Sequence, residues 1–153
     1  MTPIETETSP GLSSPGPDRS LITLGAVLFL LGLVSGLLTG LAANPRMGLS
    51  AHMQGITNGT FLIAVGAVWN HLRLSRPLRR LTFWSLATGA VLNWLTVQLA
   101  AIWGTGRLTP IAGAGFEGAP WQEMIVSAGL LVVTLSMLVA GVMLVAGFAR
   151  SSR

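Results

Sequence analysis

Four long uncharged runs divide the sequence. They extend from Leu21 to Ala43, from Met47 to Leu72, from Leu81 to Gly106 and from Met124 to Ala149. Each can cross a bilayer as a helix, because roughly 20 residues that each rise about 1.5 Å span about 30 Å of hydrocarbon. A segment in lipid must also satisfy its own backbone hydrogen bonds, which favours helices. The pattern predicts an all-α protein, an integral membrane four-helix transmembrane bundle over residues 21–149.

The composition supports a membrane protein. The chain is 51% hydrophobic and 9% charged, whereas a soluble domain usually carries about 25% charged residues. Residues 1–20 differ from the rest, because they are rich in Pro, Ser and Thr and offer little apolar surface to bury. We expect residues 1–20 to be a disordered cytoplasmic tail and residues 150–153 to be a second, short cytoplasmic tail.

The distribution of charge predicts the orientation of the chain. All nine basic residues are arginines, and with four spans Arg46 and Arg107 lie on one side of the membrane. The other seven share the opposite side: Arg19, Arg73, Arg76, Arg79, Arg80, Arg150 and Arg153. By the positive-inside rule both termini are cytoplasmic. The arginines form no aromatic-interleaved basic face, which argues against nucleic acid as a partner. The absence of cysteine excludes disulfides and thiolate chemistry.

Two glycine-rich features predict how the helices meet. Gly32, Gly36 and Gly40 recur every four residues and form one stripe along the first helix. Small residues at this spacing favour close contact with a neighbouring helix. The stretch 104–120 is rich in Gly and Pro, and we expect it to fold as a cap over the outer mouth of the bundle.

Several polar side chains fall inside the apolar runs, near the outer half of the helices. They are His52, Gln54, Thr57, Asn58 and Thr60 in the second run, and Asn93, Thr96 and Gln98 in the third. Polar groups at membrane depth are costly and often functional. Two interpretations are open: each makes an interhelical hydrogen bond worth about 0.6–2 kcal/mol, or together they form one site.

His52 is the most informative of these residues. Gly55 and Gly59 follow it at three and seven residues and therefore share its side of the helix. A flat ligand such as haem, with its iron on His52, fits such a surface; a Gly-xxx-Gly packing face beside an interfacial histidine is the alternative. His71 lies 19 residues further on, about 28 Å along a helix. Within one protomer the two histidines cannot ligate the same haem, so we expect a haem on His52 to keep an open position for Lewis-acid chemistry.

Glu117 and Glu123 fall on the predicted outer side with Arg46 and Arg107. We expect ion pairs that close the mouth of the bundle, with a role in proton transfer as the alternative.

Uncommon polar stretches carry a resemblance to a known family. Residues 44–61 read NPRMGLSAHMQGITNGTF, residues 103–113 read WGTGRLTPIAG, and Asn93-Trp94 and Glu117-Gly118 accompany them. Across residues 25–148 the chain resembles the bacterial hydroxylaminobenzene mutases. The resemblance implies an inner-membrane enzyme that isomerises hydroxylaminobenzene, a small aromatic substrate, to 2-aminophenol during nitroarene breakdown.

A more distant resemblance is to the styrene oxide isomerases, which are four-helix membrane proteins with haem b. Their second helix also carries a His followed six residues later by Asn-Gly, as His52, Asn58 and Gly59 do here. The resemblance implies that His52 ligates the iron, that Asn58 faces the substrate and that the protein is a homotrimer. Asn93 is expected to help Asn58 orient the substrate, beside the Gly55 and Gly59 surface.

One departure from the isomerases keeps the alternatives open. Those enzymes use a Tyr on the third helix, and this chain has no tyrosine. Epoxide isomerisation is therefore an alternative rather than the first expectation. A non-catalytic channel or assembly subunit, which the glycine stripe would also suit, is the third hypothesis.

Overall fold

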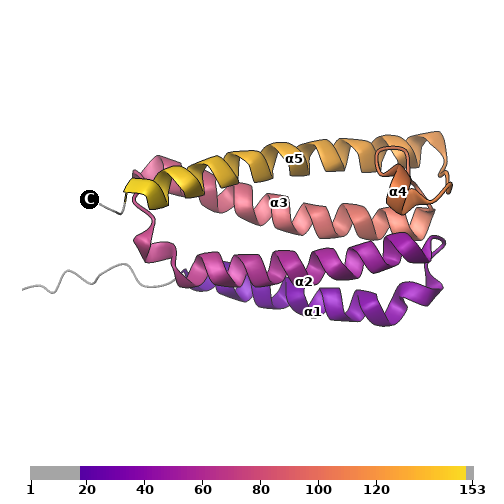
Figure 1. The fold of residues 1–153 in the computed structure, drawn as a ribbon, viewed down its shortest axis with the longest axis horizontal. Coiled ribbons are helices and arrows are strands. Elements are labelled where there is room, and N and C mark those ends of the chain that lie inside the picture. The colour runs from indigo at the N-terminus through magenta and orange to yellow at the C-terminus, as the bar shows by residue number, and fades with distance from the viewer. Residues whose placement is uncertain (1–17, 151–153) are drawn as a thin grey trace, which may run out of the picture.

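The computed structural model describes residues 18–150, and all of its regular structure is helical (Figure 1). No strand is found among these residues. The predicted tails fall mainly on residues 1–17 and 151–153, which lie outside the described part. The helices are α1 (Arg19–Leu38), α2 (Pro45–Ala67), α3 (Arg76–Trp103), the short α4 (Pro110–Gly113) and α5 (Pro120–Ala149), with 3-10 turns η1 (Thr39–Leu41) and η2 (Trp69–His71).

Polar side chains define where the first two helices begin. Asp18 caps α1, since its carboxylate accepts hydrogen bonds from the backbone N–H of Ser20 at 3.0 Å and of Leu21 at 3.2 Å. Asn44 caps α2 in the same way through the N–H of Met47 at 3.2 Å, and Pro45 occupies the first turn. The first helix therefore begins two residues before the predicted run.

The four long helices form two antiparallel hairpins, α1 with α2 and α3 with α5 (Figure 1). The hairpins meet through α2 and α3, while α5 packs on α3. Among residues 18–150, three helical segments are long and apolar enough to cross a membrane: Arg19–Leu41, α3 and α5. The helix α2 has 23 residues but is not among them, because polar residues interrupt its apolar sequence. The prediction of an all-helical fold is confirmed for the described residues, three of the predicted spans are candidate membrane helices, and the fourth span stays a prediction.

Glycines bring the backbones of α1 and α2 into contact. A Cβ on Gly32 would lie 2.6 Å from the backbone nitrogen of Ile56, and one on Gly25 would lie 2.6 Å from the carbonyl oxygen of Gly59. Real Cβ atoms essentially never come this close, so side chains here would force the helices apart. The predicted contact is confirmed at Gly32, but a Cβ added to Gly40 would meet no atom within 4 Å.

Two hydrophobic clusters lie on either side of a band of polar contacts. One contains Leu28, Leu62 and Leu86 and lies toward the end of the bundle where the arginine-rich link joins α2 to α3. The other contains Met47 and Val97, near the α3–α5 loop. This band consists of the contacts of Gln54 and Asn58 on α2 with α3, and it lies between the two clusters along both helices.

Candidate active site

His52 lies in α2, half-buried against α1. Its ring nitrogen Nδ1 is 2.8 Å from the carbonyl oxygen of Gly32. A carbonyl can only accept, so Nδ1 carries the proton in this hydrogen bond and Nε2 of the neutral ring keeps its lone pair. Histidines that ligate metals almost always donate their other N–H in this way. This hydrogen bond therefore leaves Nε2 as the ring nitrogen whose lone pair is not used by the contact with Gly32.

His52 lines a groove on the outside of the α1–α2 hairpin. The groove has a volume of about 480 Å³, and its wall is apolar apart from His52 and Thr39. The other lining residues are Leu33, Gly36, Leu37 and Leu49. No group of three or more potential metal-ligating side chains occurs among residues 18–150. A single imidazole beside an apolar groove fits a porphyrin, which brings the remaining iron ligands itself.

The predicted flat surface at Gly55 and Gly59 is wrong. The backbone of α1 covers both glycines: Gly55 lies against Gly32, and a Cβ on Gly59 would be 2.6 Å from the backbone nitrogen of Phe29. A surface that α1 occupies cannot also lie against a porphyrin. The alternative interpretation, a Gly-xxx-Gly packing face beside an interfacial histidine, describes these two residues correctly.

Asn58 and Asn93 lie at the contact between α2 and α3. Asn93 donates from Nδ2 to Oε1 of Gln54 at 2.9 Å. Asn58 is 7% exposed, and its Nδ2 is 3.4 Å from the carbonyl oxygen of Ala90. Both contacts have the form of interhelical hydrogen bonds. Around the α2 axis His52 is about 160° from Gln54 and about 120° from Asn58. Within one chain His52 therefore lies on a different face of α2 from Asn58 and from Gln54, the partner of Asn93.

Other polar residues of the band have separate roles. Thr57 and Thr60 are exposed and donate to carbonyls one turn back, so they do not join the site. Ser35 was not predicted: it is 4% exposed and accepts a hydrogen bond from Nε1 of Trp94 at 3.1 Å. The sequence feature that could have indicated Ser35 is a single serine within a run of leucine, valine and glycine. His71 is exposed in η2, at the opposite end of the bundle from the α3–α5 loop.

The α3–α5 loop, with α4 inside it, packs against the beginning of α2 as the sequence predicts for a cap. Asn44 is fully buried and donates from Nδ2 to the carbonyl oxygens of Ala112 at 3.3 Å and Gly113 at 2.9 Å. The same side chain caps α2. One amide therefore fastens the loop to the first hairpin.

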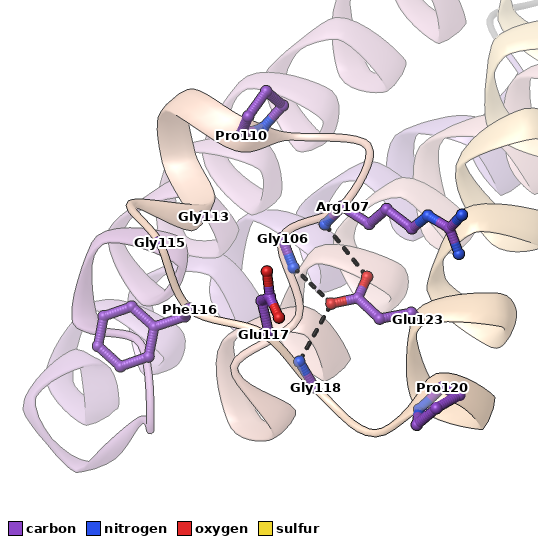
Figure 2. A pocket seen from close by; sticks show the side chains of 10 residues that line it. All are labelled: Gly106, Arg107, Pro110, Gly113, Gly115, Phe116, Glu117, Gly118, Pro120 and Glu123. Atoms are coloured by element: carbon purple, nitrogen blue, oxygen red, sulfur yellow. Dashed lines mark hydrogen bonds between the residues drawn. The ribbon is translucent and has the colours of Figure 1, made fainter.

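A buried carboxylate fastens the loop to the second hairpin (Figure 2). Glu123 is 7% exposed, and its Oε1 accepts from the N–H of Gly106 at 3.0 Å and of Gly118 at 3.1 Å. Its Oε2 accepts from the N–H of Arg107 at 3.1 Å. These residues line a cavity of about 520 Å³ that Glu117 also borders. Glu123 is thus held by backbone amides, and the interpretation as an ion pair is corrected.

Comparison with known proteins identifies the family. The family model for styrene oxide isomerase matches residues 17–149. Hydroxylaminobenzene mutase HabA of Ectopseudomonas oleovorans is 45% identical over 131 residues, which are 85% of this chain and 97% of that protein. Hydroxylaminobenzene mutase HabB of the same organism is 44% identical over 133 residues, covering 84% of this chain and 81% of that protein. No solved structure matches significantly.

These matches cover all four long helices and the α3–α5 loop. The hypothesis of a non-catalytic channel or assembly subunit is therefore not retained. The chain belongs to the styrene oxide isomerase family and is an isomerase.

Proposed function

We propose that the protein converts hydroxylaminobenzene to 2-aminophenol. The two mutases, at 45% and 44% identity, support this substrate. In the reaction the N–O bond breaks, a C–O bond forms at the ortho carbon, and the proton lost from that carbon balances the proton gained at nitrogen. No oxidant or reductant is consumed. The main observation behind the proposed mechanism is the position of the His52 ring. Its Nδ1 is hydrogen-bonded to the carbonyl of Gly32, and the ring lines an apolar groove.

Haem b is the cofactor that we propose for this site. Bound through its iron to Nε2 of His52, it would supply a Lewis acid that weakens the N–O bond. The hydrogen bond to α1 would hold the imidazole in place, and the leucines of the groove would keep water from the reacting atoms once another copy covers the groove. Excluding water favours transfer of the oxygen within one molecule over attack by solvent.

Asn58 and Asn93 are the residues that we propose to orient the substrate. A single chain holds His52 on one face of α2 and these amides on another, so a substrate at His52 cannot meet both within the same chain. We therefore propose a homo-oligomer, a trimer by likeness to the isomerases, in which a second copy closes the groove and contributes its α2–α3 face. Many large apolar side chains of α5 are exposed and remain to be covered by lipid or another copy, among them Leu131 and Val145.

For the membrane arrangement we propose four transmembrane helices. The helix α2 packs along α1 and runs between α1 and α3, both of which are apolar enough to span. If these two cross the bilayer, α2 must cross it as well to connect them. The arginine-rich end would face the cytoplasm with both termini, in the bacterial inner membrane.

The test is the origin of the product's oxygen. Membranes that contain the protein are given hydroxylaminobenzene in oxygen-18 water, and the products are analysed by mass spectrometry. We expect 2-aminophenol with almost no label. Substantial label, or mainly 4-aminophenol, would contradict transfer within the molecule.

Styrene oxide is the second candidate substrate, because the family model is that of its isomerase. The same membranes given styrene oxide separate the two candidates. Rapid conversion of the epoxide, without formation of 2-aminophenol from hydroxylaminobenzene, would favour the epoxide isomerase.

A further inference from the structure

We propose that Gly32 and Gly36 of α1 are positioning residues for His52. The carbonyl of Gly32 fixes which ring nitrogen carries the proton, and the missing side chain at Gly36 gives the ring the space to reach that carbonyl. The inference concerns the histidine ring itself, and only its consequence for cofactor binding rests on the proposed function.

The contact with Gly32 depends on the close approach of the helices. A Cβ on Gly32 would lie 2.6 Å from the backbone nitrogen of Ile56, one turn beyond His52 on α2. With the backbones this close, Nδ1 of His52 reaches the carbonyl oxygen of Gly32 at 2.8 Å. That oxygen has two lone pairs, so it can accept from the histidine and from its own helix together.

Gly36 lies one turn further along α1, directly against the His52 ring. A Cβ on Gly36 would be 2.6 Å from Nδ1, 2.9 Å from Cε1 and 3.1 Å from Cγ. All three atoms belong to the imidazole, and the first two distances are shorter than real Cβ contacts. An alanine at this position must therefore displace the ring, which moves Nδ1 away from the Gly32 carbonyl.

A ring held in this position has one defined tautomer. With the proton held on Nδ1, the lone pair is on Nε2, and Nε2 is the nitrogen available to a ligand in the groove that His52 lines. A ring released from Gly32 can rotate and can take either tautomer. Loss of such a supporting hydrogen bond typically lowers metal affinity or activity by about 10- to 100-fold.

The first experiment measures the tautomer without any cofactor. The full chain contains two histidines, so nitrogen-15 NMR of selectively labelled histidine shows two rings, and His71→Ala assigns them. We expect the His52 proton on Nδ1 in the native sequence. Gly36→Ala should give the other tautomer or a mixture of both. Gly40→Ala is the matched control, because Gly40 lies four residues further on and a Cβ there would meet no atom within 4 Å.

A His52 proton on Nε2 in the native chain would overturn the inference, and this measurement needs no variant to fold. An unchanged tautomer in Gly36→Ala would also overturn it. Helix content by circular dichroism and the elution volume in detergent confirm that each variant compared is folded.

The second experiment is titration with haem, followed by absorption spectroscopy. We expect Gly36→Ala to bind about 10- to 100-fold more weakly than the native chain, with a shifted Soret band, and Gly40→Ala to bind like the native chain. Equal affinity and an identical spectrum in Gly36→Ala would refute the positioning role while leaving the haem proposal intact. If the NMR result holds but the native chain binds no haem, the positioning role stands and the haem proposal falls.

Discussion

Removing the carboxylate of Glu123 should release the α3–α5 loop. The bond to the Gly106 N–H is buried, so its loss leaves an unsatisfied donor that costs about 1–3 kcal/mol. The bonds to the N–H groups of Arg107 and Gly118 are partly buried, and water can replace them at a cost of about 0.5–1 kcal/mol each. We expect Glu123→Ala to destabilise the closed loop by about 2–5 kcal/mol.

Hydrogen exchange followed by mass spectrometry measures this effect locally. Since each 1.4 kcal/mol is a factor of ten, amides of residues 106–118 should exchange roughly 30- to 4000-fold faster in Glu123→Ala. Glu123→Gln should give a smaller increase, because its amide oxygen can still accept while its NH₂ group faces a backbone donor.

Glu117→Gln is the matched control for this measurement. Glu117 borders the same cavity but is exposed, so its substitution should change stability by less than about 0.5 kcal/mol. Equal exchange of the loop amides in Glu123→Ala and Glu117→Gln would refute the reasoning, because the buried carboxylate would then not hold the loop.

The remaining predictions concern the proposed site and its support. His52→Ala should abolish haem binding and turnover in a folded protein while His71→Ala changes neither, as absorption spectra and product assays will show; full haem retention in His52→Ala would remove the ligand assignment. Asn58→Ala and Asn93→Ala should lower turnover more than haem content, because an orienting hydrogen bond matters most as charge develops, whereas unchanged turnover in both would leave them a packing role alone. Asn44→Ala should lower the thermal unfolding midpoint, since it removes a helix cap worth about 1 kcal/mol and two bonds to loop carbonyls; an unchanged midpoint would mean that water replaces all three bonds.

The pattern of hydropathy along the chain predicted much of the fold. The apolar runs correspond to the four long helices, and the Gly- and Pro-rich stretch 104–120 forms the loop that packs against α2. The fourth span shows the limit of this approach. The polar residues that indicated a site in α2 also make this helix less apolar than the three candidate membrane spans.

The candidate site was predicted only in part, because periodicity shows which residues share a helix face but not what covers that face. Gly55 and Gly59 do share a side with His52, yet α1 occupies that side. The hydrogen bond from Nδ1 to Gly32 joins residues 20 positions apart, and no spacing rule indicates it. Glu123 was expected to pair with arginine, since the sequence does not show which backbone amides a loop will turn toward it.

The glycine contact between α1 and α2 also bears on how the chain is made. On its own, α2 is a poor substrate for membrane insertion, because it carries His52 and Gln54 among other polar groups. Once α1 has emerged from the ribosome, its glycine face can cover one side of α2, and its Gly32 carbonyl can accept the histidine proton. If α2 crosses the membrane as we propose, the first two helices would leave the translocon as one hairpin. A substitution that separates these backbones would thus act during biosynthesis, as a failure to integrate α2, before any effect on the finished enzyme.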